Sequence, residues 1–167
     1  MRIIRHISSF PKKLKGGAVA IGNFDGIHRG HQALIKQSRT LADLVRGPTL
    51  ALTFEPHPRN VFQPDAPPFR LTPFRSKARL LAGLGVDCLI SRRFDKQASL
   101  QSADDFVRDV LATGLGPRHV VVGYDFVFGH RRGGNVALLR EAGERLGFEV
   151  SVLEPVTHDD DVCSSTI

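Results

Sequence analysis

The sequence predicts a doubly wound α/β domain, in which a parallel sheet of five strands carries helices on both faces. Three observations predict this fold class. The chain has 167 residues, 41% of them hydrophobic, which is enough to bury one substantial core. Short apolar runs alternate along the chain with longer amphipathic segments. The apolar runs are continuous instead of alternating with polar residues, as expected for parallel strands that are buried on both faces.

The expected strands are short apolar runs, and most of the segments between them have helical periodicity. Parallel strands joined in this way are connected by right-handed crossovers, so the helices are expected to cover both faces of the sheet. We expect the strands at residues 18–22, 49–54, 86–91, 119–123 and 148–153.

Four helices are expected between these strands, and residues at the ends of three of them support the assignment. Thr72 is expected to cap the second helix, with Pro73 at its first position. Ser102 would cap the third helix. Asn135 would cap the fourth helix and Gly147 would end it. We expect the helices at residues 28–45, 73–83, 103–112 and 136–146.

One long stretch, residues 55–71, lacks periodicity and is rich in proline. A loop of this length within a compact domain is uncommon unless it is functional or disordered. We therefore treat this stretch as part of a candidate functional site.

The charge balance favours anionic partners. Lys and Arg number 23 and Asp and Glu number 17, a formal net charge of +6. The basic residues are scattered, and no nucleic-acid-binding module accompanies them.

The 2 cysteines form no CxxC motif and exclude a disulfide framework. The apolar runs are too short to cross a bilayer and residues 1–10 lack a signal-peptide core, so we expect a cytoplasmic protein without a membrane partner.

The first predicted strand runs into a turn that carries the strongest local signal. His28 and His31 are three positions apart, so both imidazoles lie on one side at the N-terminus of the expected helix. Unpaired backbone N–H groups and the positive end of the helix dipole lie beside them. Gly30 lets a ligand approach the backbone without meeting a Cβ atom. The turn therefore predicts an anion site that could hold a polyphosphate.

Two other interpretations of the histidine pair stay open at this point. Two surface histidines can begin a helix by chance. A pair with this spacing can also bind zinc, but zinc needs further ligands, and nothing nearby in the sequence supplies them.

Further motifs make the signal more specific. The segment 53–58 (TFEPHP) ends the second strand, and the segment 123–134 (GYDFVFGHRRGG) follows the fourth. Near the end of the chain, Ser164, Ser165 and Thr166 resemble the start of the phosphate-binding motif SSTxIR. The turn at residues 22–31 resembles the signature of the nucleotidyltransferase superfamily. Taken together, the motifs resemble those of bacterial FAD synthetases, in the same order and over residues 18–167, and imply a Rossmann-like sheet.

The resemblance implies FMN adenylyltransferase activity, in which ATP and FMN give FAD and pyrophosphate by in-line attack without a covalent intermediate. Mg²⁺ would arrive with ATP, and Asp125 is its candidate ligand. The implied catalytic residues are His28, His31, Ser164, Ser165 and Thr166. The implied ATP-binding residues are Gly22, Asn23, Phe24, Asp25, Gly26, His28, Gly30, His31, Arg132, Ser165 and Thr166. The implied flavin-binding residues are Phe54, Pro56, His57, Pro58, Asp125, Phe126 and Phe128.

Alternatives remain for the rings and for the activity. Phe54, Phe126 and Phe128 could belong to the core instead of contacting flavin. The acceptor could be phosphopantetheine or nicotinate mononucleotide, as in other adenylyltransferases, although the TFEPHP and DFxFG segments favour FMN. A nucleic-acid-binding domain is a further alternative, suggested by the net positive charge.

The resemblance also bears on domain organisation. FAD synthetases usually continue into a riboflavin kinase domain, which makes the FMN that is consumed here. Residues 1–167 correspond to the adenylyltransferase domain and end before SSTxIR is complete. We therefore expect a domain that is truncated at its C-terminus and lacks the covalently linked kinase.

Overall fold

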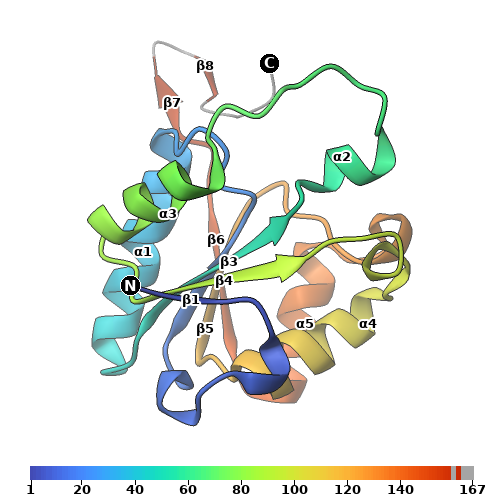
Figure 1. Ribbon diagram of the computed structural model, residues 1–167. Coiled ribbons are helices and arrows are strands. Elements are labelled where there is room, and N and C mark those ends of the chain that lie inside the picture. Colours follow the sequence, from blue (N-terminus) through green and yellow to red (C-terminus); the bar gives the residue numbers. More distant parts are fainter. Residues whose placement is uncertain (159–160, 163–167) are drawn as a thin grey trace.

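The computed structural model describes residues 1–158 together with residues 161 and 162. Its centre is a six-stranded sheet in the order β1-β4-β3-β2-β5-β6, in which every pair of neighbours is parallel (Figure 1). The parallel sheet confirms the predicted fold class. The strands are β1 (Arg2–Ile4), β2 (Ala18–Ile21), β3 (Thr49–Glu55), β4 (Cys88–Arg93), β5 (His119–Gly123) and β6 (Glu149–Leu153).

The sheet contains one strand more than the five that the sequence predicted. β1 has 3 residues and lies at the edge of the sheet, where Arg2 is opposite Cys88 of β4. Arg2 and Ile3 are exposed, and only Ile4 is partly buried. An edge strand this short needs no continuous apolar run, so the pattern that identifies buried strands does not detect it.

Helices cover both faces of the sheet, as predicted. α1 (Arg29–Leu44) and α3 (Phe74–Gly83) lie on one face, and α5 (Val136–Leu146) lies on the other (Figure 1). α4 (Ala103–Asp105) lies beside α5 and continues directly into a π-helical segment, η4 (Phe106–Leu115). Successive strand residues point to opposite faces. Ala20 and Val121 therefore pack under α1 and α3, whereas Val19 and Val120 pack under η4 and α5.

Shorter elements complete the described part of the chain. α2 (Pro58–Phe62) lies within the stretch that showed no periodicity in the sequence. β7 (Thr157–His158) and β8 (Asp161–Val162) pair as a small antiparallel ladder. The four short 3₁₀ turns are η1 (Ile7–Ser9), η2 (Lys12–Leu14), η3 (Ala98–Leu100) and η5 (His130–Arg132). Within the described residues, none of the helices has both the length and the apolar character that crossing a bilayer requires.

Three of the predicted helix ends are confirmed. The Ser102 side chain accepts a hydrogen bond from the backbone N–H of Asp105 at 3.1 Å, and the Asn135 side chain accepts one from Leu138 at 2.9 Å. Gly147 ends α5 in the left-handed conformation that favours glycine, with φ +88°.

The predicted cap at Thr72 is wrong. α3 begins at Phe74, Pro73 occupies the N-cap position, and no side-chain hydrogen bond caps this end. The Thr72 hydroxyl instead accepts a hydrogen bond from the backbone N–H of Gly26 at 2.8 Å. A partner 46 positions away in the sequence has replaced the local one. This contact joins the start of α3 to the segment between β2 and α1.

Candidate functional site

The segment that joins β2 to α1, residues 22–28, lies where open parallel sheets bind ligands, beyond the carboxyl ends of the central strands. We call it the β2–α1 turn. His28 is the N-cap residue of α1, but its side chain makes no capping hydrogen bond, and the first turn of the helix contains no acidic residue. The backbone N–H groups and the helix dipole therefore favour an anion at this position.

The two imidazoles that the sequence singled out lie together. The rings of His28 and His31 stack with centroids 3.7 Å apart and planes inclined by 27°. The ring of Phe24 packs against His31, with centroids 5.3 Å apart. The Nδ1 atom of each imidazole is buried and has no hydrogen-bond partner within the described residues. Buried polar atoms are usually paired, so these two nitrogens indicate a position for a ligand.

Both imidazoles are largely neutral at pH 7 in the free protein. The pKa of His31 is lowered to about 3, mainly by burial and also by His28 and the charge of Lys77, while Asp25 opposes the shift. Burial also lowers the pKa of His28. A neutral imidazole has one N–H donor, which it can offer to a phosphate oxygen. A bound polyphosphate would raise both pKa values, because a nearby negative charge favours the protonated ring.

The β2–α1 turn contains residues in the left-handed backbone conformation. The φ angles are +51° for Phe24, +77° for Gly26 and +41° for Ile27. Glycine adopts this conformation readily, but a side chain with a Cβ atom adopts it at a cost. Phe24 and Ile27 are both buried, so packing holds them in place. The turn is therefore held in one shape before any ligand arrives.

Asp25 connects this turn to the start of α3. It is 3% exposed, and its carboxylate accepts hydrogen bonds from the backbone N–H groups of Leu71, at 3.0 Å, and Thr72, at 2.8 Å. These contacts are within the protein. The ATP contact that the resemblance implied for Asp25 stays a prediction.

Beneath the turn lies a lysine that sequence reasoning did not select as a site residue. Lys77 is 1% exposed, and its Nζ atom donates to the Asn23 carbonyl oxygen at 2.7 Å and to Oε1 of Glu55 at 3.0 Å. Arg70 also pairs with the Glu55 carboxylate. Its position in the sequence could have identified it as buried, because Lys77 lies one turn before the buried Leu81 on the apolar side of α3. Lysines are seldom fully buried without a partner.

The end of β3 forms the corner predicted to face flavin. The Glu55–Pro56 peptide is cis. Nδ1 of His57 accepts a hydrogen bond from the N–H of Arg59 at 3.1 Å and so caps α2, whose first residue is Pro58. Burial lowers the pKa of His57. Phe54 is partly buried and packs against the core next to this corner.

The segment after β5 carries the remaining predicted site residues. Phe126 and Phe128 stack with centroids 5.2 Å apart and planes inclined by 18°. Phe128 is 8% exposed and belongs to the core, and Phe126 is partly buried against it. Asp125 and Arg132 are exposed. A core position is thus confirmed for Phe128, whereas flavin contacts by these rings stay a prediction.

Three predicted catalytic residues, Ser164, Ser165 and Thr166, lie outside the described residues. Within residues 1–158, 161 and 162, no three His, Cys, Asp or Glu side chains are grouped to hold a metal ion. The zinc interpretation of the histidine pair therefore gains no further ligand from this part of the chain.

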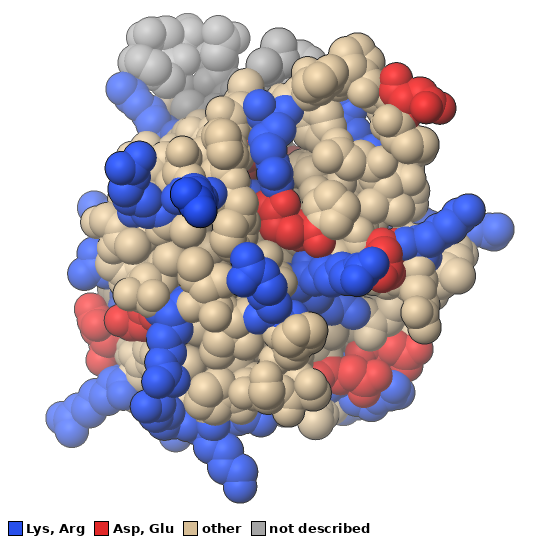
Figure 2. Space-filling model, in the orientation of Figure 1, with Lys and Arg blue, Asp and Glu red and all other residues tan. Residues whose placement is uncertain are grey.

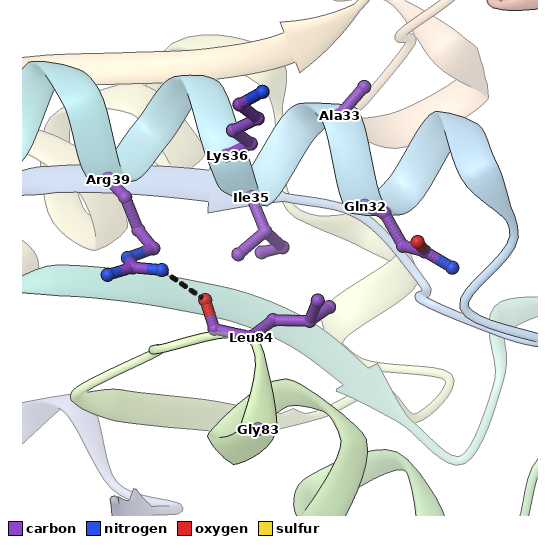
Figure 3. A pocket seen from close by; sticks show the side chains of 7 residues that line it. All are labelled: Gln32, Ala33, Ile35, Lys36, Arg39, Gly83 and Leu84. Atoms are coloured by element: carbon purple, nitrogen blue, oxygen red, sulfur yellow. Dashed lines mark hydrogen bonds between the residues drawn. The ribbon is translucent and has the colours of Figure 1, made fainter.

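A cavity of about 390 Å³ lies between α1 and α3 (Figure 3). In the wall of this cavity, Nη1 of Arg39 donates a hydrogen bond to the Leu84 carbonyl oxygen at 3.2 Å. None of the predicted site residues lines this cavity, so it is separate from the β2–α1 turn. Its lining residues are Gln32, Ala33, Ile35, Lys36, Arg39, Gly83 and Leu84.

Two solved structures share the fold. A Streptococcus pneumoniae structure described as a macrolide-efflux protein matches with TM-score 0.85 and 24% identity, over 98% of this chain and 53% of that one. A pantoate-beta-alanine ligase from Francisella tularensis, complexed with beta-gamma ATP and beta-alanine, matches with TM-score 0.60 and 16% identity. This match covers 99% of this chain and 71% of the ligase. At these identities the likeness concerns the fold alone. It agrees with the α/β class and the parallel sheet described above.

The family follows from the sequence comparison. Residues 10–167 match the FAD synthetase family, and the chain belongs to it. A bifunctional riboflavin kinase/FMN adenylyltransferase from Escherichia coli strain K12 is 39% identical over 152 residues, which cover 90% of this chain and 49% of the relative. A protein of the same description from Pseudomonas fluorescens is 38% identical over 166 residues, which cover 99% of this chain and 53% of the relative. The chain spans about half the length of the curated relatives that it matches.

Proposed function

We propose that this chain is an FMN adenylyltransferase, which transfers AMP from ATP to FMN and releases pyrophosphate. The single observation that carries the proposal is the stacked pair of His28 and His31, with unpartnered buried nitrogens, at an uncapped helix N-terminus. Membership of the FAD synthetase family supports the choice of FMN as acceptor.

The proposed reaction needs positioning and charge neutralisation more than covalent chemistry. A phosphate oxygen of FMN attacks the α-phosphorus of ATP in line, and the bond from this phosphorus to the bridging oxygen breaks. Pyrophosphate leaves with the electron pair. Imidazole N–H groups and backbone N–H groups at the start of α1 would donate to the phosphate oxygens, where negative charge increases in the transition state.

The other predicted residues complete the two halves of the proposed site. The β2–α1 turn and Gly30 would contact the nucleotide, and Arg132, Ser165 and Thr166 would bind its phosphates. The flavin ring would lie near the β3 corner and the Phe126 ring. We infer that the FMN comes from a riboflavin kinase, the activity named with FMN adenylyltransferase in the relatives from Escherichia coli and Pseudomonas fluorescens.

Mg²⁺ fits the proposed site as a companion of ATP. Mg²⁺ characteristically binds substrate phosphates with only one or two protein carboxylates and keeps several waters. Asp125 supplies one exposed carboxylate, two residues after the end of β5. It would hold the ion, and the ion would neutralise phosphate charge.

The surface is compatible with anionic substrates. Figure 2 shows basic side chains over several parts of one face, with acidic groups between them. A groove that binds nucleic acid usually has its basic residues clustered in a stripe or patch. On the face that Figure 2 shows, the distribution of charge therefore favours small phosphorylated substrates over nucleic acid.

A direct assay tests the proposal. The purified chain is incubated with Mg²⁺, ATP labelled at the α-phosphate, and FMN, and the products are separated and identified by mass. We expect the label in FAD and an equal amount of pyrophosphate. Parallel reactions contain phosphopantetheine, nicotinate mononucleotide or riboflavin, the last of which lacks the attacking phosphate. Pyrophosphate release with another acceptor but not with FMN would overturn the proposal.

A further inference from the structure

We propose that Lys77 is a positioning residue of the site: through the Asn23 carbonyl it holds the β2–α1 turn in the shape that orients the imidazole of His31. The effect of Lys77 on catalysis rests on the function proposed above, whereas its effect on the shape of the β2–α1 turn does not.

Stability alone does not explain the burial of Lys77. Moving an ammonium out of water is energetically costly, and a buried ion pair often contributes no more stability than apolar side chains of similar size. Its partner Glu55 is 18% exposed and also pairs with Arg70. Glu55 would therefore keep a cationic partner if Lys77 were replaced.

The second contact of the ammonium goes to the turn itself. The Asn23 carbonyl oxygen accepts hydrogen bonds from Nζ of Lys77 at 2.7 Å and from Oγ1 of Thr53 at 3.1 Å. These two bonds use both lone pairs of the oxygen. One donor belongs to α3 and the other to β3, so two packed elements fix this peptide group from different directions.

The fixed peptide group precedes the residue that supports His31. Phe24 has φ +51°, a conformation that a phenylalanine keeps only when its surroundings hold it there. Its ring is fully buried, with its centroid 5.3 Å from that of His31. The contacts thus run from Lys77 through the turn to His31, which stacks on His28. A displacement of about 1 Å in a reacting group can lower a rate about 100-fold.

Electrostatics supports the same arrangement. The positive charge of Lys77 lowers the pKa of His31, in addition to the effects of burial and of His28, and it also lowers the pKa of His57. The ammonium therefore acts on imidazoles of both halves of the proposed site. It favours the neutral form of His31 until a polyphosphate arrives.

The test compares Lys77→Met with Arg79→Met, which removes a positive charge from an exposed position on the same helix. We expect Lys77→Met to fold and to melt within a few degrees of the parent chain. Its kcat for FAD formation should fall about 10- to 100-fold, with KM for ATP and FMN changed less than about threefold. Arg79→Met should keep the parent kcat. A purely structural role would lower the melting temperature and leave kcat of the folded protein unchanged.

A second measurement does not depend on activity. NMR titration of the imidazoles should show the pKa of His31 rising toward 6.5 in Lys77→Met, with altered ring shifts from the displaced Phe24. Parent-like kcat together with unchanged His31 signals would overturn the positioning role and leave the proposed function intact. Absence of FAD formation by the parent chain would instead overturn the proposed function, and the NMR result would still test Lys77.

If Lys77→Met does not fold, Thr53→Val provides the test, because it removes the other hydrogen bond to the Asn23 carbonyl and keeps the ammonium. A folded Thr53→Val chain with lowered kcat and shifted His31 signals supports the proposal. A folded chain with parent values of both overturns it.

Discussion

Thr72 and Asp25 are joined across 47 positions of the sequence, because the backbone N–H of Thr72 donates to the Asp25 carboxylate at 2.8 Å. A second hydrogen bond joins the same two segments, because the N–H of Gly26 donates to the Thr72 hydroxyl at the same distance. The start of α3 and the β2–α1 turn are therefore joined by hydrogen bonds in both directions. The proposed phosphate site depends on a segment that contributes no imidazole to it.

Replacing Asp25 by alanine should destabilise the fold. The N–H groups of Leu71, which is part-buried at this contact, and of Thr72, which is buried, would lose their acceptor, and such a loss typically costs about 1 to 3 kcal/mol. Urea unfolding measures this loss, with Asp43→Ala, at an exposed position on α1, as the matched control. An unfolding free energy equal to that of the control would show that these hydrogen bonds do not stabilise the turn.

Replacing His31 by alanine should lower FAD formation about 100- to 1,000-fold, the usual effect of losing a donor that stabilises charge in the transition state. The initial rate of FAD formation at saturating ATP and FMN measures this. His6→Ala, at an exposed position near the N-terminus, is the control and should keep the parent rate. Near-normal turnover by His31→Ala would argue against a role for the imidazole in the reaction.

Stability should fall as the pH decreases from about 7 to about 4. The pKa of His31 is lowered from 6.5 to about 3 in the folded protein. Between these values the unfolded chain binds a proton that the folded chain does not, so the free energy of unfolding rises with pH. The substitution His31→Asn removes this difference in proton binding. Between pH 7 and 4.5 the variant should therefore lose about 1 to 3 kcal/mol less stability than the parent chain. Parallel stability curves for the two chains, measured by urea unfolding at each pH, would contradict the burial of a neutral ring.

Phe126 and Phe128 should respond differently to replacement by alanine. Phe128 is a core residue, so Phe128→Ala should lower the free energy of unfolding by about 3 to 5 kcal/mol. Phe126 is only partly buried, and Phe126→Ala should mainly raise KM for FMN, with a smaller loss of stability. Thermal melting and steady-state kinetics on both variants separate the effects. An unchanged KM for FMN in Phe126→Ala would place that ring in the core instead of the flavin site.

Much of the fold could be predicted because the signals are local. Continuous apolar runs identified five of the six strands in the main sheet, and Ser102, Asn135 and Gly147 mark helix ends through contacts within a few residues. The spacing of His28 and His31 placed both rings on one side of a helix N-terminus, where they indeed stack. The three-residue edge strand β1 lacked any such signal.

The parts that escaped prediction depend on residues that are far apart in the sequence. A threonine before a proline at a helix start is typical of an N-cap, yet the Thr72 hydroxyl is used by Gly26, 46 positions away. Lys77 is separated from the Asn23 carbonyl by 54 positions, and no local pattern relates the two. Periodicity and capping motifs report the conformation of one segment at a time. Only the packing of α3 against the sheet brings a buried ammonium under the turn, and with it the support of the histidine pair.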